Sequence, residues 1–147
     1  MPGLRFFSLL LAAASGAVMA VQGSVNALLG KISGLWEATF VVHAVGAAFA
    51  GMLLLFLKSG GFSRLGQAPW YAWIGGILGV LIIYGVARSI PQVGVAPATT
   101  AIILGQVLTA TVIDHFGLLG MTRLPFNYWR ILGCVFLASG AWFLLKK

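Results

Sequence analysis

Long apolar runs, separated by short stretches that contain glycine, proline or charge, make up most of the chain. A helix needs roughly 20 apolar residues to cross a hydrocarbon core about 30 Å thick. Five segments reach this length and predict membrane-spanning helices at about 6–29, 36–57, 70–87, 94–113 and 128–145. A β-barrel would alternate apolar and polar residues, and a soluble bundle would leave each helix a polar face. Because neither pattern occurs, we expect one all-helical transmembrane domain over residues 1–147.

The composition is typical of an integral membrane protein, which is embedded in the lipid bilayer. Hydrophobic residues make up 61% of the chain and charged residues 7%, whereas a soluble domain carries about 25% charged residues. The net charge of +7 could indicate a nucleic-acid partner. However, the nine lysines and arginines lie singly or in pairs between apolar runs, so no nucleic-acid binding is expected. Cys134 is the single cysteine and therefore cannot form a disulfide within the chain.

The first apolar stretch also has the outline of a secretory signal peptide. Arg5 precedes the run FFSLLLAAASGAVMA, which ends in small residues at Ala20, and this order is typical of a cleaved leader. The apolar character continues through VNALL, however, and the remaining chain is itself membrane-embedded. We therefore interpret the stretch as the first spanning helix, with a signal peptide as the alternative.

The lysines and arginines are divided almost equally between the two sides of the membrane that the five spans define. Five lie on the side of the N-terminus and four on the opposite side: Arg5, Lys58, Arg64, Arg123 and Arg130 against Lys31, Arg88, Lys146 and Lys147. Because cytoplasmic loops normally carry the excess of positive charge, this balance predicts no preferred orientation. Such a chain can insert both ways and pair head-to-tail with itself. The alternatives are that a partner protein sets the orientation or that so few charges carry no signal.

Several polar side chains lie inside the predicted spans, where exposure to lipid is costly. The candidates for a solute pathway are Gln22, Asn26, Glu37, Thr39, His43 and Gln106. The first span ends, and the second begins, on the same side of the membrane, so their polar residues share one half of the bilayer. Amides, a hydroxyl and an imidazole can bind a polar solute through hydrogen bonds without a fixed charge. The alternative is that these groups only join helices, and that Glu37 is a first-turn carboxylate favoured by the helix dipole.

Other positions favour structural roles. Asp114 lies at the end of the fourth span, on the side that also carries Arg130, and we expect an ion pair or loop anchor there. Small residues let helices approach closely in membranes. This predicts packing positions at Gly46, Gly75, Gly79, Gly133 and Gly140.

Catalytic patterns are missing from the sequence. It contains no Ser–His–Asp set, no His and Cys group spaced for a metal, and no phosphate-binding glycine loop followed by lysine. The two acids, Glu37 and Asp114, lie on opposite sides of the membrane, so they cannot act as a pair. We therefore expect no enzymatic activity, no metal and no cofactor.

Four stretches resemble the five-helix, YdcZ-like branch of the drug/metabolite transporter superfamily: QGSVNALLG, W…GGILGV, GQVLTATVIDHFGLLG and RILGCVFLASGAWFL. Their order and spacing extend the resemblance over nearly the whole chain. It implies a multi-pass transporter of the inner membrane. Larger, EamA-like members of the superfamily carry two such units, and because five is odd the second is inverted relative to the first. A single unit can rebuild that architecture only by pairing antiparallel with itself or with a sister protein.

The resemblance also implies roles for individual residues. Gln22, Asn26 and Gln106 match polar positions of the family pattern, whereas Asp114 and Gly117 match its D-x-F-G turn, which favours a structural role.

The coupling mechanism does not carry over simply. The four-helix multidrug members exchange cations for protons through a carboxylate deep in the first helix, and that helix has only amides here. If protons are coupled, His43 and Glu37 are the candidates on that side. We expect a dimer that moves a small polar or cationic metabolite by alternating access. A non-transporting membrane subunit or assembly partner is the alternative, and a passive channel is a weaker one.

Overall fold

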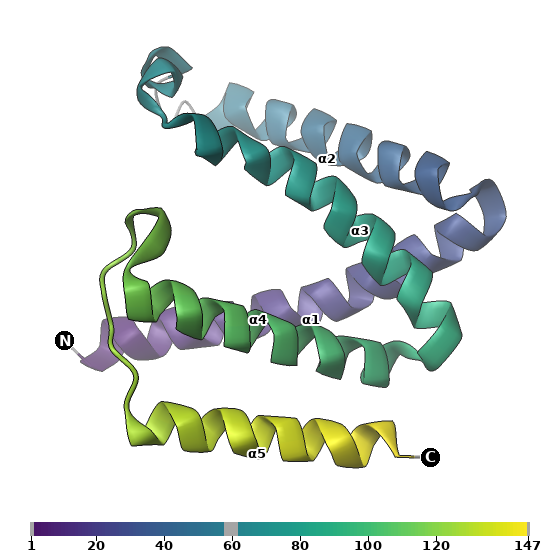
Figure 1. The fold of residues 1–147 in the computed structure, drawn as a ribbon. Coiled ribbons are helices and arrows are strands. Elements are labelled where there is room, and N and C mark those ends of the chain that lie inside the picture. The colour runs from purple at the N-terminus through teal and green to yellow at the C-terminus, as the bar shows by residue number, and fades with distance from the viewer. Residues whose placement is uncertain (1, 58–61, 147) are drawn as a thin grey trace. The chain divides into compact units, whose positions relative to one another are not determined.

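The computed structural model describes residues 2–57 and 62–146, and these residues are nearly all helical (Figure 1). Lys58 and Lys147, which enter the charge count, lie outside the described residues. The long helices are α1 (Pro2–Ser33), α2 (Leu35–Leu57), α3 (Ile74–Val93), α4 (Val95–Phe116) and α5 (Tyr128–Leu145). Short 3-10 helices form η1 (Phe62–Gln67), η2 (Trp70–Trp73) and η3 (Leu118–Gly120). The predicted all-helical class with five membrane-spanning helices is confirmed.

Each long helix is apolar around most of its circumference. The 18-residue stretches that qualify the five spans have mean hydropathies of 1.9, 2.3, 1.8, 1.6 and 1.5, and no more than 6% of each such stretch is buried within the described residues. Surfaces of this kind are unfavourable in water and suit lipid or a second apolar chain. α1 has 32 residues, which corresponds to about 48 Å at 1.5 Å per residue. It is therefore longer than the hydrocarbon core is thick, and it must tilt or extend into the headgroups.

Helix boundaries differ from the predicted spans where glycine and proline remain helical. α1 continues through Gly30 to Ser33, and the break falls at Gly34, whose φ of +98° favours glycine. α3 likewise continues through Pro91 to Val93. Pro91 cannot donate a hydrogen bond to the carbonyl of Ala87, and the helix ends two residues later at Val93.

By backbone contacts the chain divides into two compact units, residues 1–92 and 93–147. In the first unit α2 and α3 run antiparallel (Figure 1), and the rings of Trp36 and Tyr84 stack between them with centroids 4.4 Å apart. Contacts between α1 and α2 complete the unit. Its buried apolar side chains are mostly alanines, namely Ala27, Ala38 and Ala87, together with Ile90. Small side chains thus allow these helices to approach closely.

The second unit consists of α4 and α5, which lie side by side and antiparallel (Figure 1). Its buried residues are again alanines, Ala98 on α4 and Ala141 on α5. η3 and an extended segment over residues 121–127 connect the two helices. Both units therefore build their helix contacts from small residues and leave their large apolar side chains exposed.

Candidate functional site

Close packing of α1 against α3 buries the polar end of α1. A Cβ atom at Gly23 would lie only 2.9 Å from Cγ1 of Val86 and 3.1 Å from Cδ1 of Ile90, so the bare glycine permits the contact. Asn26 follows almost one turn later on the same face, and its residue is 5% exposed. The contact at Gly23 was missed by sequence reasoning, because a single sequence does not show which helix lies opposite a glycine.

Among the residues that the structure describes, the side-chain amides of α1 have no hydrogen-bond partner. Within residues 2–57 and 62–146, neither Gln22 nor Asn26 makes a side-chain hydrogen bond, whereas Ser15 and Ser24 both bond to carbonyls of their own helix, those of Leu11 and Ala20. No fully enclosed side-chain nitrogen or oxygen in this part of the chain lacks a partner. The Asn26 amide is therefore not fully enclosed by protein, and it remains able to donate and accept hydrogen bonds.

Thr39 and His43 each bond through the side chain to the backbone carbonyl four residues earlier on α2. The Thr39 residue is 2% exposed, and its hydroxyl donates to the carbonyl of Leu35 at 2.7 Å. Nδ1 of His43 lies 2.8 Å from the carbonyl oxygen of Thr39. Since a carbonyl only accepts, Nδ1 must carry a proton and Nε2 is the atom left for other chemistry. That Nε2 faces α3, 3.2 Å from where a Cβ at Gly79 would be.

Glu37 occupies the first turn of α2 and is exposed. Its carboxylate lies against Gly34, at the position a side chain on that residue would take. A negative charge in the first turn of a helix is stabilised by the helix dipole. The geometry thus matches the first-turn arrangement expected as the structural alternative for Glu37, and no contact joins it to His43 within the described residues.

Gln106 belongs to the second unit, where its side chain is exposed on α4. Like the amides of α1, it makes no side-chain hydrogen bond within the described ranges, whereas the hydroxyls of Thr100 and Thr111 on the same helix bond to its own carbonyls. An exposed amide in an apolar helix requires water, a solute or another helix as its partner.

Asp114 and Arg130 tie the α4–α5 connection to the ends of both helices. Nη1 of Arg130 lies 3.4 Å from Oδ2 of Asp114 and donates to the carbonyl of Leu124 at 3.1 Å. The backbone carbonyl of Asp114 accepts from the N–H of Leu124 at 2.7 Å. Gly117 ends α4 with a φ of +63°, a left-handed conformation that allows the chain to reverse. These contacts are those of a loop anchor.

The glycines expected to pack divide into two groups. Gly79 meets His43 as described above. A Cβ at any of the other four would meet no atom of the described residues within 4 Å: Gly46, Gly75, Gly133 and Gly140. Their role in packing against another chain stays a prediction.

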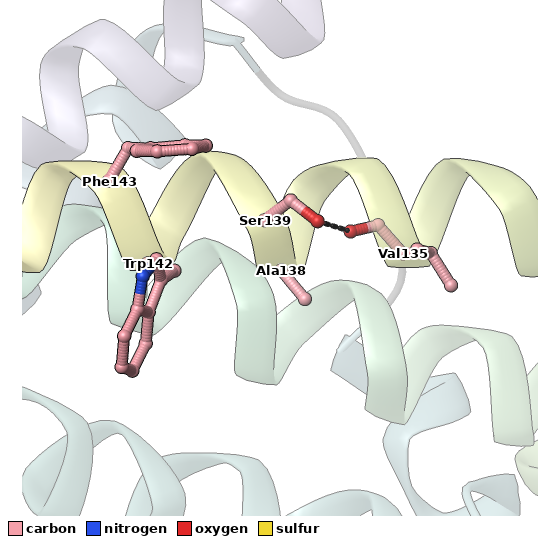
Figure 2. A pocket seen from close by; sticks show the side chains of 5 residues that line it. All are labelled: Val135, Ala138, Ser139, Trp142 and Phe143. Carbon is pink, nitrogen blue, oxygen red and sulfur yellow. Dashed lines mark hydrogen bonds between the residues drawn. The ribbon is translucent and has the colours of Figure 1, made fainter.

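A shallow groove on α5 carries none of the predicted pathway residues. It has a volume of about 600 Å³, and Figure 2 shows that Val135, Ala138, Ser139, Trp142 and Phe143 line it from that one helix. Its only side-chain hydroxyl, on Ser139, donates to the carbonyl of Val135 at 2.8 Å. Apart from the indole N–H of Trp142, the groove therefore offers an apolar surface.

A comparison with known protein families decides the assignment. Residues 7–143 match a family model described as "Putative inner membrane exporter, YdcZ", of the drug/metabolite transporter type. The chain belongs to this family. No curated protein and no solved structure matches the chain.

Membership accounts for the fold and the location together. A family of inner-membrane exporters requires several membrane-spanning helices, and the chain supplies five. The protein is thus a multi-pass protein of the inner membrane and belongs with transporters rather than with enzymes. The resemblance that the four sequence stretches suggested is confirmed.

Proposed function

We propose that the protein exports a small polar or cationic metabolite by alternating access, and that two chains are needed to form the pathway. The observation that carries this proposal is the free hydrogen-bonding capacity of the amides inside apolar helices. Gln22, Asn26 and Gln106 make no side-chain hydrogen bond within the described residues, although each lies in a span. Together with the family of exporters matched over residues 7–143, these amides favour a pathway for a hydrogen-bonding solute.

The chemistry of the amides limits the solute. An amide donates and accepts hydrogen bonds but carries no charge, so it can orient an alcohol, an amine or an amide without holding an ion tightly. Nε2 of His43 adds a site that can accept a proton or a hydrogen bond. We propose that Asn26 contacts the solute on the α1 side of the pathway and that His43 is the candidate for proton coupling.

The exposure of two of these amides supports the proposed dimer. Gln22 and Gln106 lie on exposed surfaces of their helices, where lipid cannot satisfy them. A second chain in the opposite orientation would cover both and would restore the two-unit architecture of larger superfamily members. The nearly equal charge on the two sides of the membrane supports this arrangement.

Transport into proteoliposomes tests the proposal. The purified protein is reconstituted and assayed with radiolabelled choline, ethanolamine, glycerol and a set of neutral amino acids, with an imposed proton gradient. For any compound that is transported, we expect Asn26→Ala, Gln22→Ala and Gln106→Ala each to lower the rate about tenfold, the effect of losing one hydrogen bond to a desolvated polar group. Ser15→Ala is the matched control, because the Ser15 hydroxyl bonds only to its own helix.

Dimer content, measured by crosslinking in the same vesicles, separates the proposal from its alternative. Loss of transport with an unchanged dimer supports a solute pathway. If each variant instead dissociates the dimer in proportion to its loss of transport, the amides only join helices and the proposed pathway is wrong.

A further inference from the structure

A small pocket lies where the end of α1, the start of α2 and the end of α3 meet. Its volume is about 200 Å³, and all of its lining residues belong to the first unit. They are Ala27, Gly30, Lys31, Leu35, Ala87, Arg88, Pro91 and Gln92. We call this the basic pocket. It contains none of the residues assigned to the proposed export pathway.

Two cations line the basic pocket without a matching acid. Neither Lys31 nor Arg88 forms an ion pair within the described residues, in which the pair between Asp114 and Arg130 is the only one. The sole acid of residues 1–92 is Glu37, and its carboxylate lies beside Gly34 rather than in the pocket lining. The pocket is therefore positively charged.

The position of Arg88 is not explained by its own helix. Lys31 lies in the last turn of α1, where a cation is stabilised by the helix dipole even without a ligand. Arg88 does not lie in the last turn of α3, so this explanation does not apply to it. Gln92 follows one turn after Arg88 on the same face, and its amide adds donors beside the guanidinium.

The basic pocket lies near helix ends, where we expect lipid headgroups. Lys31 is three residues from the turn at Gly34, so the pocket opens at the end of two membrane-spanning helices and the start of a third. The apolar walls formed by Leu35 and Ala87 lie next to the two cations. A polar group flanked by apolar surface at this level is the arrangement that phospholipid headgroups and the first part of their acyl chains present.

We propose that the basic pocket binds a phosphate group, carried by an acidic phospholipid or by a soluble phosphate compound. Arg88 holds two phosphate oxygens through its planar guanidinium, Lys31 contributes a point charge, and Gln92 donates a further hydrogen bond. The proposal does not depend on which solute is exported.

Binding to the delipidated protein in neutral detergent tests this site. Dioleoylphosphatidylglycerol is titrated and detected by native mass spectrometry, with dioleoylphosphatidylcholine as the zwitterionic reference and inorganic phosphate as the soluble competitor. The variant Lys31→Gln/Arg88→Gln is compared with the matched control Arg5→Gln/Arg64→Gln, which removes the same charge from exposed positions of the same unit outside the pocket. We expect the pocket variant to bind the acidic lipid about thirtyfold more weakly, since each cation near a membrane surface contributes about fivefold, and the control to bind normally.

Each outcome of the titration has a definite meaning. Selective loss in the pocket variant, with no competition by phosphate, supports the site and identifies lipid as the source. Competition by inorganic phosphate, also lost in the pocket variant, supports the site and identifies a soluble phosphate compound. Equal binding by both variants, or no preference of the unmodified protein for phosphatidylglycerol over phosphatidylcholine and no phosphate binding, overturns the proposal.

A second pair of variants covers the case in which the double variant fails to fold. Gln92→Glu places a negative charge in the pocket without removing a cation, and Gln67→Glu places the same charge on exposed η1. We expect Gln92→Glu alone to weaken binding about fivefold. If the two variants bind the probe equally, the basic pocket is not the site.

Discussion

Gly79 and Gly75, one turn apart on α3, differ in what an added methyl group would meet. A Cβ at Gly79 lies 3.2 Å from Nε2 of His43, whereas one at Gly75 meets nothing within 4 Å. Gly79→Ala should therefore displace the imidazole and lower the stability of the protein by about 1 kcal/mol, as overpacking does. The thermal midpoint of the detergent-solubilised protein measures this change.

Gly75→Ala is the control for that measurement, since alanine is the better helix former and nothing opposes its methyl group. We expect Gly75→Ala to leave the midpoint unchanged or to raise it. If Gly75→Ala destabilises the protein as much as Gly79→Ala, the cost comes from another chain or from lipid rather than from His43.

At the residue scale, polarity could be predicted from the sequence but contacts could not. Asn26 and Gln106 stand out because each is an amide within an apolar run. That Asn26 is buried while Gln106 is exposed depends on which helix lies opposite, and the apolar runs are too uniform to show it. Gly23 illustrates the same limit, because its contact with Val86 and Ile90 is a property of the α1–α3 pairing.

His115 adds to the contacts of Asp114 and Arg130 that hold the connection between α4 and α5. The N–H of Phe126 donates to Nδ1 of His115 at 3.1 Å, and the centroids of the two rings lie 4.4 Å apart. The guanidinium Nε of Arg123 donates to the carbonyl of the same histidine at 3.1 Å. His115→Phe keeps an aromatic ring but removes the acceptor, so it should loosen the segment while leaving the helices intact.

Trypsin cleavage after Arg123 reports this loosening. Losing one hydrogen bond destabilises the segment by about 1 kcal/mol. Because trypsin acts on the opened segment, cleavage of His115→Phe should be about fivefold faster. Thr111→Val is the matched control, because the Thr111 hydroxyl bonds only to the carbonyl of Val107 one turn earlier. Equal cleavage rates in the unmodified protein and in His115→Phe would show that the Phe126 hydrogen bond does not hold the segment.

At the element scale, the helices follow from composition but their ends do not. The predicted first span ends at residue 29, before the first glycine of GKISG, whereas α1 ends at Ser33, before the second. Both residues are permissive, so local propensity cannot choose between them. Gly30 instead lies against Leu35, whose Cδ2 atom is 2.9 Å from where a Cβ at Gly30 would be, and the sequence alone does not show this contact.

At the scale of the whole molecule, five apolar spans and their family were predictable because both rest on long stretches of sequence. A predominantly apolar stretch of roughly 20 residues allows few alternatives, and the family match extends over residues 7–143. The number of chains in the functional transporter depends on which helix surfaces contact a second chain, and the apolar spans do not show this. It therefore stays a prediction, and orientation is the measurement that addresses it.

Orientation is expected to be mixed, because five cations on one side of the membrane and four on the other give no bias. With Cys134→Ala in place and a single cysteine added after Lys147, a membrane-impermeant thiol reagent should label about half of the protein in intact cells, and all of it after lysis.

Lys146→Gln/Lys147→Gln leaves two cations on the side of the C-terminus against five, so labelling in intact cells should rise well above half. Arg5→Gln/Arg64→Gln leaves three against four, so labelling should fall. If labelling is all-or-none in the starting protein and neither charge change moves it, orientation is fixed by something other than these charges. The antiparallel pair would then require an oppositely inserted sister protein, because one chain cannot supply both orientations.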